Sequence, residues 1–165
     1  LVATAGASAA GTVISREQAA QQVQQWKAKG KKVAFTNGVF DILHPGHIFS
    51  LSEAAKEGDY LVVGLNADAS VKRLKGDSRP VNNQDARAIL MASLLMVDAV
   101  VIFEEDTPLE LITAILPDVI VKGGDYTPEQ VAGGKEVIAA GGKVVINPIL
   151  EGYSTTGLIA RMKEN

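Results

Sequence analysis

The stretch FTNGVFDILHPGHIFSL, residues 35–51, joins an apolar strand-like run to a helix-like run through a turn that holds the chain's two histidines. The turn reads His44-Pro-Gly-His47, and the run before it ends in Thr-Asn-Gly. A helix that begins near Gly46 points unpaired backbone N–H groups and the positive end of its dipole at the edge of a sheet. With two imidazole donors added, the stretch predicts an anion site between a strand and a helix.

Apolar runs and helix-like segments alternate along the rest of the chain. The expected strands are residues 31–36, 60–66, 98–103, 118–122 and 141–147, and the expected helices are 15–30, 46–58, 84–96, 107–116 and the segment from 154 onward. In the third of these helices, Ile89, Leu90 and Leu94 fall on one side. The strands are apolar throughout, which is typical of strands with both faces covered. We therefore expect an α/β fold: a doubly wound, Rossmann-like parallel sheet of about five strands with helices on both faces.

Composition limits the class of protein. The chain has 165 residues, a net charge of −3 and no cysteine. We expect one domain over 15–165, preceded by a tail over 1–14 that is flexible, a remnant of cloning or the trimmed end of a longer chain. The acidic balance argues against a broad nucleic-acid surface, and no apolar run approaches the ~20 residues that span a membrane. The lack of cysteine favours a reducing, cytoplasmic location.

A metal site and a nucleophilic site are both less favoured for the histidine pair. A zinc site needs about four ligands, and two histidines without cysteine leave only carboxylates to complete it, so we expect no protein-held metal. The chain has no G-x-S-x-G nucleophile turn, no G-x-G-x-x-G after the first strand and no P-loop. Two ordinary loop histidines remain the simplest alternative.

Polar residues gather where the expected strands end. Ligands of doubly wound sheets bind beyond those carboxyl ends. Residues with side chains or backbone suited to phosphate follow the first, second, fourth and fifth strands. Glu104, Glu105 and Asp106 follow the third strand, and we expect them to face solvent or the far rim of the site.

The strand–HxGH–helix arrangement resembles the nucleotidyltransferase superfamily that includes cytidylyltransferases and pantetheine-phosphate adenylyltransferase. Four further motifs, GLNADASVKRLKGDSRPVN (64–82), VDAVVIFEEDTP (97–108), ILPDVIVKGGDY (115–126) and EGYSTT (151–156), narrow the likeness. Together they resemble bacterial D-glycero-β-D-manno-heptose 1-phosphate adenylyltransferases over roughly residues 15–163. Some of those enzymes are free-standing, and others are the C-terminal half of a protein that also carries a sugar kinase.

The resemblance implies transfer of AMP from ATP to the heptose 1-phosphate, which yields pyrophosphate and an ADP-heptose for lipopolysaccharide core or surface glycans. It implies Mg²⁺ held mainly by the nucleotide phosphates, and ATP and a sugar 1-phosphate as partners. It implies no nucleic acid and no membrane, and it leaves open a homodimer and a sugar kinase, separate or fused. The acceptor phosphate has a second pKa of ~6 and arrives ionised, so no general base is required.

Site residues follow by position in these motifs. The expected catalytic residues are His44, His47 and Lys72, with Lys75 as the rival lysine. The expected nucleotide-binding residues are Thr36, Asn37, Gly38, Phe40, Asp41, Gly46, Asp68, Lys75, Gly123, Gly124, Asp125, Tyr126, Ser154, Thr155 and Thr156. The expected substrate-phosphate residues are Arg79, Arg87 and Lys122. Asp41 either orients a histidine or caps a turn, and a surface salt bridge is the alternative for Arg87.

Two rival functions stay open at this point. One is a glycerol-phosphate-type cytidylyltransferase that uses CTP, because the HxGH chemistry would be the same. The other is a non-catalytic module that senses a nucleotide. Ile159 stands where several relatives carry an arginine, so we assign no phosphate role to the nearby Arg161.

Overall fold

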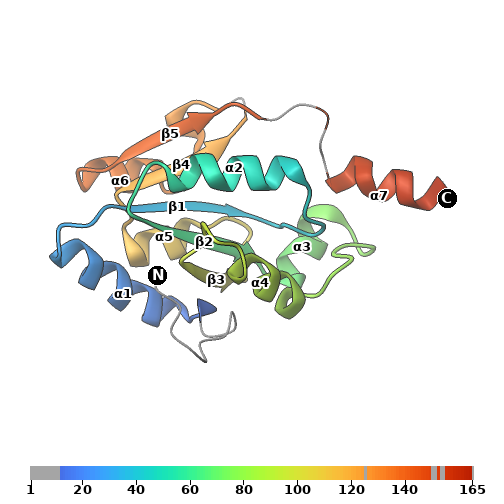
Figure 1. Cartoon of the computed structure of the whole chain (residues 1–165), viewed down its shortest axis with the longest axis horizontal. Helices are drawn as coiled ribbons and strands as arrows, with labels where there is room; N and C mark the ends of the chain where they lie inside the picture. The colour runs from blue at the N-terminus through green and yellow to red at the C-terminus, as the bar shows by residue number, and fades with distance from the viewer. Residues whose placement is uncertain (1–11, 125, 150–151, 153–154, 165) are drawn as a thin grey trace.

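A five-stranded, all-parallel sheet forms the centre of the protein (Figure 1). The computed structural model describes residues 12–124, 126–149, 152 and 155–164. The strands are β1 (Val33–Gly38), β2 (Tyr60–Asn66), β3 (Ala99–Phe103), β4 (Val119–Gly123) and β5 (Lys143–Asn147), in the order β3-β2-β1-β4-β5. The predicted doubly wound fold is thereby confirmed. The order reverses between β1 and β4, which is the switch point where such sheets bind ligands.

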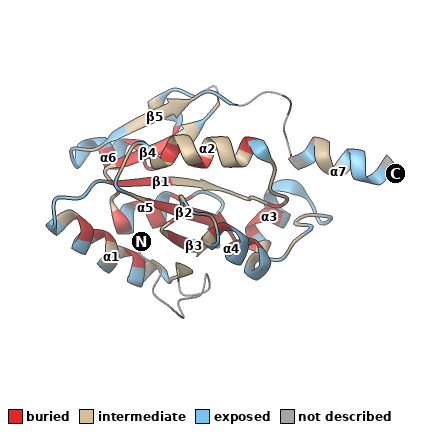
Figure 2. Cartoon of the chain, viewed as in Figure 1, coloured by how far each residue is buried: buried red, intermediate tan, exposed pale blue. Residues whose placement is uncertain are grey.

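Helices cover both faces of the sheet (Figure 2). The helices are α1 (Arg16–Ala28), α2 (Pro45–Ala55), α3 (Asp68–Lys75), α4 (Gln84–Ala92), α5 (Leu109–Ile115), α6 (Gly134–Ala139) and α7 (Thr155–Glu164), with a 3₁₀ turn at Pro128–Gln130. One core lies between the sheet and α1, α5 and α6, and a second lies between the sheet and α2 and α4. Val33 and Phe35 enter the first core and Ala34 enters the second, as the two-residue alternation of a strand requires.

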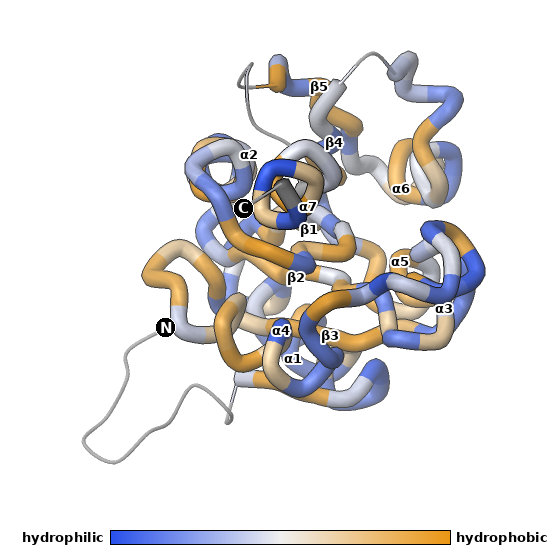
Figure 3. The backbone as a smooth tube through the Cα atoms, turned by 90° about the vertical axis from the view of Figure 1, so that its right-hand side faces the viewer, coloured by the Kyte–Doolittle hydropathy of each residue, from blue (hydrophilic) through white to orange (hydrophobic). Residues whose placement is uncertain are grey.

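The strands β2 and β3, mainly orange in Figure 3, are buried over most of their length. The first three residues of β1 and of β4 are buried, and β5 is half-buried or exposed throughout. Aspartates that precede β3 and β4 fix the opposite, amino-terminal end of the sheet. Asp118 Oδ2 accepts from the amide of Val33, and Asp98 Oδ2 accepts from the amide of Leu61, both at 2.8 Å. These side chains satisfy edge amides that the ladder leaves open, so neighbouring strands start in register.

Two expectations change at this level. Val13, placed in the tail by sequence, forms a parallel bridge with Val100, and Ile14 N donates to Val100 O at 2.9 Å. The edge strand β3 offers unpaired backbone groups to this segment. The hydrophobic side of the third expected helix is not the face that α4 buries: Ile89 and Leu90 are exposed, whereas Leu94, after the end of α4, packs against the second core. No helix in the described part of the chain is long and apolar enough to cross a membrane.

Candidate active site

Two cavities meet at the switch point between β1 and β4. The larger, about 460 Å³, extends from the end of β1 toward α3 and the 3₁₀ turn, and the smaller, about 210 Å³, extends toward α2. Asn37, Gly38, Val39 and Lys122 border both. The end of β1 and Lys122 therefore lie between the two cavities. Two molecules bound in these cavities would meet at this boundary.

The turn before α2 holds the two histidines in a reciprocal cap. His44 is the N-cap of α2, and its Nδ1 accepts from Gly46 N at 3.1 Å. His47 Nδ1 in turn accepts from His44 N at 3.3 Å. The rings stack with centroids 3.8 Å apart. This is a capping box built from imidazoles, and it satisfies two amides that a helix start otherwise leaves open.

The cap also fixes the protonation of both rings. A ring nitrogen that accepts a backbone hydrogen bond carries no proton, so each neutral imidazole carries its proton on Nε2. Burial lowers the pKa of His44 below its ordinary value. Burial, followed by the nearby His44 ring, lowers the pKa of His47 to about 4. At neutral pH both histidines are therefore uncharged donors. His47 borders the smaller cavity, whereas His44 borders neither cavity and contacts the site through the His47 ring.

Phe40 closes the smaller cavity beside His47. The two rings meet edge to face with centroids 5.3 Å apart. Phe40 has a φ of +48°, an unusual conformation for a bulky residue, and its ring lies against Gly38. A Cβ on Gly38 would come within 2.9 Å of that ring, so a larger residue there would require the Phe40 ring to move. The sequence had placed both residues at the nucleotide pocket, and both border this cavity.

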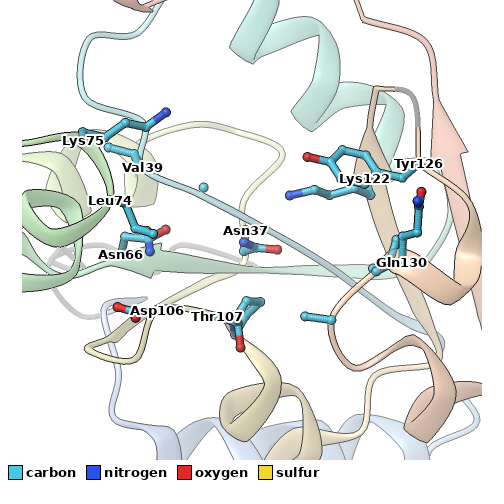
Figure 4. Close-up of a pocket in the computed structure, with 14 residues that line it drawn as sticks. Asn37, Val39, Asn66, Leu74, Lys75, Asp106, Thr107, Lys122, Tyr126 and Gln130 are labelled. Carbon is cyan, nitrogen blue, oxygen red and sulfur yellow. The ribbon is translucent and has the colours of Figure 1, made fainter.

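The larger cavity is lined by residues from the ends of β1, β2 and β4, from α3, from the loop after β3 and from the segment that follows β4 (Figure 4). Its lining comprises Asn37, Gly38, Val39, Asn66, Leu74, Lys75, Asp106, Thr107, Pro108, Lys122, Tyr126, Gln130, Val131 and Ala132. Residues 130–132 were not predicted, because they lie outside every quoted motif. Val39, Leu74, Thr107 and Pro108 lie within quoted motifs but were not assigned to the site. Asp106 borders the cavity although its side chain is 60% exposed, which agrees with the expected rim position.

Among the lysines, position favours Lys75 and Lys122 over Lys72. Lys75 borders the larger cavity, whereas Lys72 is exposed on α3 and borders neither cavity. Burial lowers the pKa of the Lys122 ammonium below its ordinary value, and its Nζ lies 5.3 Å from the centroid of the Tyr126 ring. The catalytic role of either α3 lysine stays a prediction.

Asp41 holds a loop instead of orienting a histidine. Its buried carboxylate accepts from Arg79 Nε at 2.9 Å and from the amides of Val81 and Asn82. Burial alone would raise the pKa of Asp41, but these two amides and the Arg79 guanidinium lower it below its ordinary value. Of the two roles expected for Asp41, the structure supports the structural one. Arg79 is committed in part to this contact.

Arg87 is neither a substrate-phosphate ligand nor a surface ion pair, which corrects the expectation from sequence. Its side chain is 0% exposed. Its Nη1 donates to Val39 O and Asn66 O, both at 2.8 Å, and its Nε donates to Asn82 O at 2.9 Å. Its Nη2 donates to Asp68 Oδ1 at 2.8 Å, so Asp68 also serves this network. Arg87 therefore joins the ends of β1 and β2 to the loop before α4.

The remaining predicted residues divide into three groups. Thr36, Gly123 and Tyr126 border one of the cavities. Gly46, Gly124 and Thr156 border neither: Gly46 is buried in the first turn of α2, Gly124 follows β4 with a φ of +111°, and Thr156 is exposed on α7. Asp125, Ser154 and the side chain of Thr155 lie outside the described residues. In Figures 1 and 3, α7 projects from the side of the molecule where the strands end.

The family model described as cytidylyltransferase-like matches residues 35–161. The chain belongs to this cytidylyltransferase-like family. Among curated relatives, proteins named "Bifunctional protein HldE" are 57% identical over 150 residues in Caulobacter vibrioides and 62% identical over 137 residues in Rhodopseudomonas palustris. These alignments cover 91% and 83% of this chain but 31% and 28% of the relatives. The chain thus spans about a third of the length of those relatives.

Solved structures agree with the family assignment. A lipopolysaccharide core biosynthesis protein from Thermoplasma volcanium is 31% identical, with a TM-score of 0.61 over 76% of this chain and 100% of that chain. Pantoate-beta-alanine ligase from Francisella tularensis, solved with an ATP analogue and β-alanine, has a TM-score of 0.58 at 17% identity. The second likeness is one of fold alone.

Proposed function

We propose that this chain transfers AMP from ATP to D-glycero-β-D-manno-heptose 1-phosphate and releases pyrophosphate. The observation that carries the proposal is the imidazole capping box at the start of α2, which fixes the orientation of both rings and places His47 at the cavity beside the switch point. The likeness to HldE proteins supports the choice of a heptose phosphate. The product is an ADP-heptose, which serves the assembly of lipopolysaccharide core or other surface glycans.

The proposed chemistry requires positioning and charge neutralisation. The acceptor phosphate is ionised near neutral pH, since the second pKa of a phosphomonoester is ~6. It attacks the α-phosphate of ATP, and pyrophosphate leaves in line with the new bond. His44 and His47 donate hydrogen bonds to the phosphates as negative charge accumulates, and Lys122 lies between the two cavities to neutralise it. A neutral imidazole suits this task because it donates a hydrogen bond from Nε2 without transferring its proton to the phosphate.

The protein residues alone do not make a metal site. Among the described residues, no three His, Cys, Asp or Glu side chains gather as ligands. Mg²⁺ prefers several waters and phosphate oxygens, so it would enter with the triphosphate. The dependence on Mg²⁺ is thus a proposal about the nucleotide complex.

The bifunctional relatives suggest a partner activity. They are about three times as long as this chain, and the proposed second activity is a sugar kinase that makes the heptose 1-phosphate. Kinase and adenylyltransferase would then act in sequence on one substrate, either in one protein or as separate chains. A homodimer is a further proposal, to be tested by light scattering.

A substrate matrix tests the proposal. Pyrophosphate release is measured with ATP or CTP, each with heptose 1-phosphate or glycerol 3-phosphate. We expect turnover with ATP and heptose 1-phosphate to exceed every other pair by at least about tenfold in kcat/KM. A preference for CTP and glycerol 3-phosphate would identify the rival cytidylyltransferase. Nucleotide binding without turnover on any pair would favour a sensing module.

The variant His47→Asn separates chemistry from folding. The asparagine Oδ1 can still accept from the His44 amide, so the cap is kept, while the donor at the Nε2 position is lost. We expect turnover to fall by about 10²-fold or more, the scale for loss of a donor to a developing charge. Thermal unfolding should stay close to that of the unmodified protein. An unchanged rate in a folded variant would remove His47 from the mechanism.

A further inference from the structure

The larger cavity has two chemically different sides. In Figure 4 the amines of Lys75 and Lys122 lie toward the upper part of the view, and the polar groups of Asp106 and Thr107 lie at the lower part. A phosphate is drawn to the lysines and repelled by the carboxylate. The side with Asp106 therefore suits the uncharged part of a phosphorylated ligand.

Asp106 is held in place for such a contact. Arg73 Nε donates to Asp106 Oδ1 at 2.8 Å, and Arg73 Nη2 donates to the carbonyl of Glu104. The ion pair offsets the charge of Asp106 and fixes the loop after β3 to α3. The Asp106 side chain stays 60% exposed, which leaves carboxylate oxygen accessible at the cavity. An ionised carboxylate only accepts hydrogen bonds, so its natural ligand is a hydroxyl group.

Neighbouring groups complement the carboxylate. The Thr107 Oγ1 accepts from Leu109 N at 3.4 Å, which leaves its own hydroxyl hydrogen to donate. Across the cavity, Gln130 Oε1 accepts from Thr127 N at 2.9 Å, so the amide NH₂ of Gln130 is the group left for a ligand. The cavity thus offers acceptors and donors together, the mixture that a polyhydroxylated ligand requires.

We propose that Asp106 and Thr107 form the subsite that reads the hydroxyl groups of the acceptor, while its phosphate lies on the side of Lys75 and Lys122. This inference rests on the proposed function and deepens it, since it makes Asp106 a specificity-determining residue for a sugar phosphate. The loop after β3 then selects the sugar. The HxGH turn contributes to AMP transfer in a way that does not depend on which sugar is bound.

The test compares Asp106→Asn with Glu104→Gln, a matched loss of one negative charge on the same loop at a residue that borders neither cavity. Pyrophosphate release is measured at saturating ATP. We expect the KM for heptose 1-phosphate to rise about tenfold or more in Asp106→Asn, the scale for loss of one hydrogen bond to a charged group. The KM for ATP should not change, and Glu104→Gln should resemble the unmodified protein.

Methyl phosphate separates the contribution of the lysine side of the cavity from that of the Asp106 side, because it carries the phosphate and no sugar hydroxyl. As a competitive inhibitor it should have the same Ki in both variants and in the unmodified protein. An unchanged KM for heptose 1-phosphate in Asp106→Asn, an equal rise in Glu104→Gln, or a parallel change in the Ki of methyl phosphate would overturn the subsite.

Failure of the proposed function is a separate result. If the unmodified protein does not turn over ATP and heptose 1-phosphate, the subsite is tested by calorimetric titration of glycerol 3-phosphate and methyl phosphate. Weaker binding of glycerol 3-phosphate alone in Asp106→Asn supports a hydroxyl subsite for another acceptor. Equal affinities in the two proteins, or no binding of either ligand, overturn it.

Discussion

Replacement of Arg87 tests whether a buried arginine holds the active-site loops. In Arg87→Met the side-chain volume is largely kept, but the charge and all four hydrogen bonds are lost. Three of those bonds are to backbone carbonyls, and the fourth is to the Asp68 carboxylate. A hydrogen bond to a charged group contributes about 1.5–3 kcal/mol, and such bonds in one network do not add. Breaking a buried charge network typically costs about 3–5 kcal/mol, which is the loss we expect.

The single tryptophan provides the assay. Trp26 is buried and stacks on Tyr60 with ring centroids 4.1 Å apart, so its fluorescence should report unfolding in urea. Arg87→Lys restores the charge without the planar fork, and we expect it to recover only part of the loss. The control is Arg73→Met, which removes an ion pair whose arginine side chain is 50% exposed and should cost less than about 1 kcal/mol.

The alternative role for Arg87 predicts a different pattern. A substrate-phosphate ligand could be replaced with little loss of stability and a raised KM for the sugar phosphate. If the free energy of unfolding of Arg87→Met lies within about 1 kcal/mol of that of the unmodified protein, the Arg87 network does not hold the loops. If its stability falls as expected, the catalytic effect should appear in the KM for both substrates, because Val39 borders both cavities.

Two further predictions concern pH and packing. Because the pKa of His47 is about 4 in the folded protein and near 6.5 when unfolded, only the unfolded state gains this proton between those values. Stability should therefore fall as pH drops from 6.5 toward 4, and the urea midpoints of His47→Asn should fall less over this range. A Cβ at Gly133, whose φ is +78°, would lie 2.6 Å from Ile112 Cγ2, so Gly133→Ala should lose about 2–3 kcal/mol in urea unfolding. Gly30→Ala, at a similar φ in open space, is the control and should lose about 1 kcal/mol.

The strands and the longer helices were predictable because their signals are local. The run at 60–66 is continuous and apolar, and it forms β2 with those bounds. The first expected helix, 15–30, begins at Ser15, which forms a reciprocal capping box with Gln18. The helices α3 and α6 were not predicted. Each is short and buries only two residues, so neither has the apolar stripe that marks a helix in sequence.

The face that α4 buries differs from its apolar side, for a physical reason that the sequence of the helix does not contain. Hydrophobic periodicity puts Ile89 and Leu90 inward and a charged residue outward. In the structure Arg87 is buried with Ala88 and Met91, and the two aliphatic residues are exposed. The carbonyls that Arg87 binds belong to segments up to 48 residues away. A single helix therefore carries no information about them.

The same distinction explains the outcome for the site. The HxGH turn could be recognised because its cap, its anion-binding geometry and its glycine all lie within four residues. The polar side of the larger cavity was only partly predictable: Asp106 was expected at solvent or the far rim, but its contact with Arg73, 33 residues away in sequence, was not predicted. Gln130 enters the cavity from a 3₁₀ turn whose cap involves only its own neighbours. Such residues become visible as a group only when the sheet brings the ends of its strands together.

Arginine and lysine have separate tasks around the described cavities. Arg87, Arg79 and Arg73 each bind backbone carbonyls or a carboxylate and join loops that follow different strands. Lys75 and Lys122 border the larger cavity. The guanidinium has five donors in a rigid plane and can hold several fixed groups at once, whereas an ammonium on a flexible stem can follow a phosphate that moves during a reaction. The division implies that an Arg→Lys change at position 87 and a Lys→Arg change at position 122 are both disruptive. The first removes hydrogen bonds that join the loops around the cavities, and the second replaces a mobile ammonium with a rigid guanidinium.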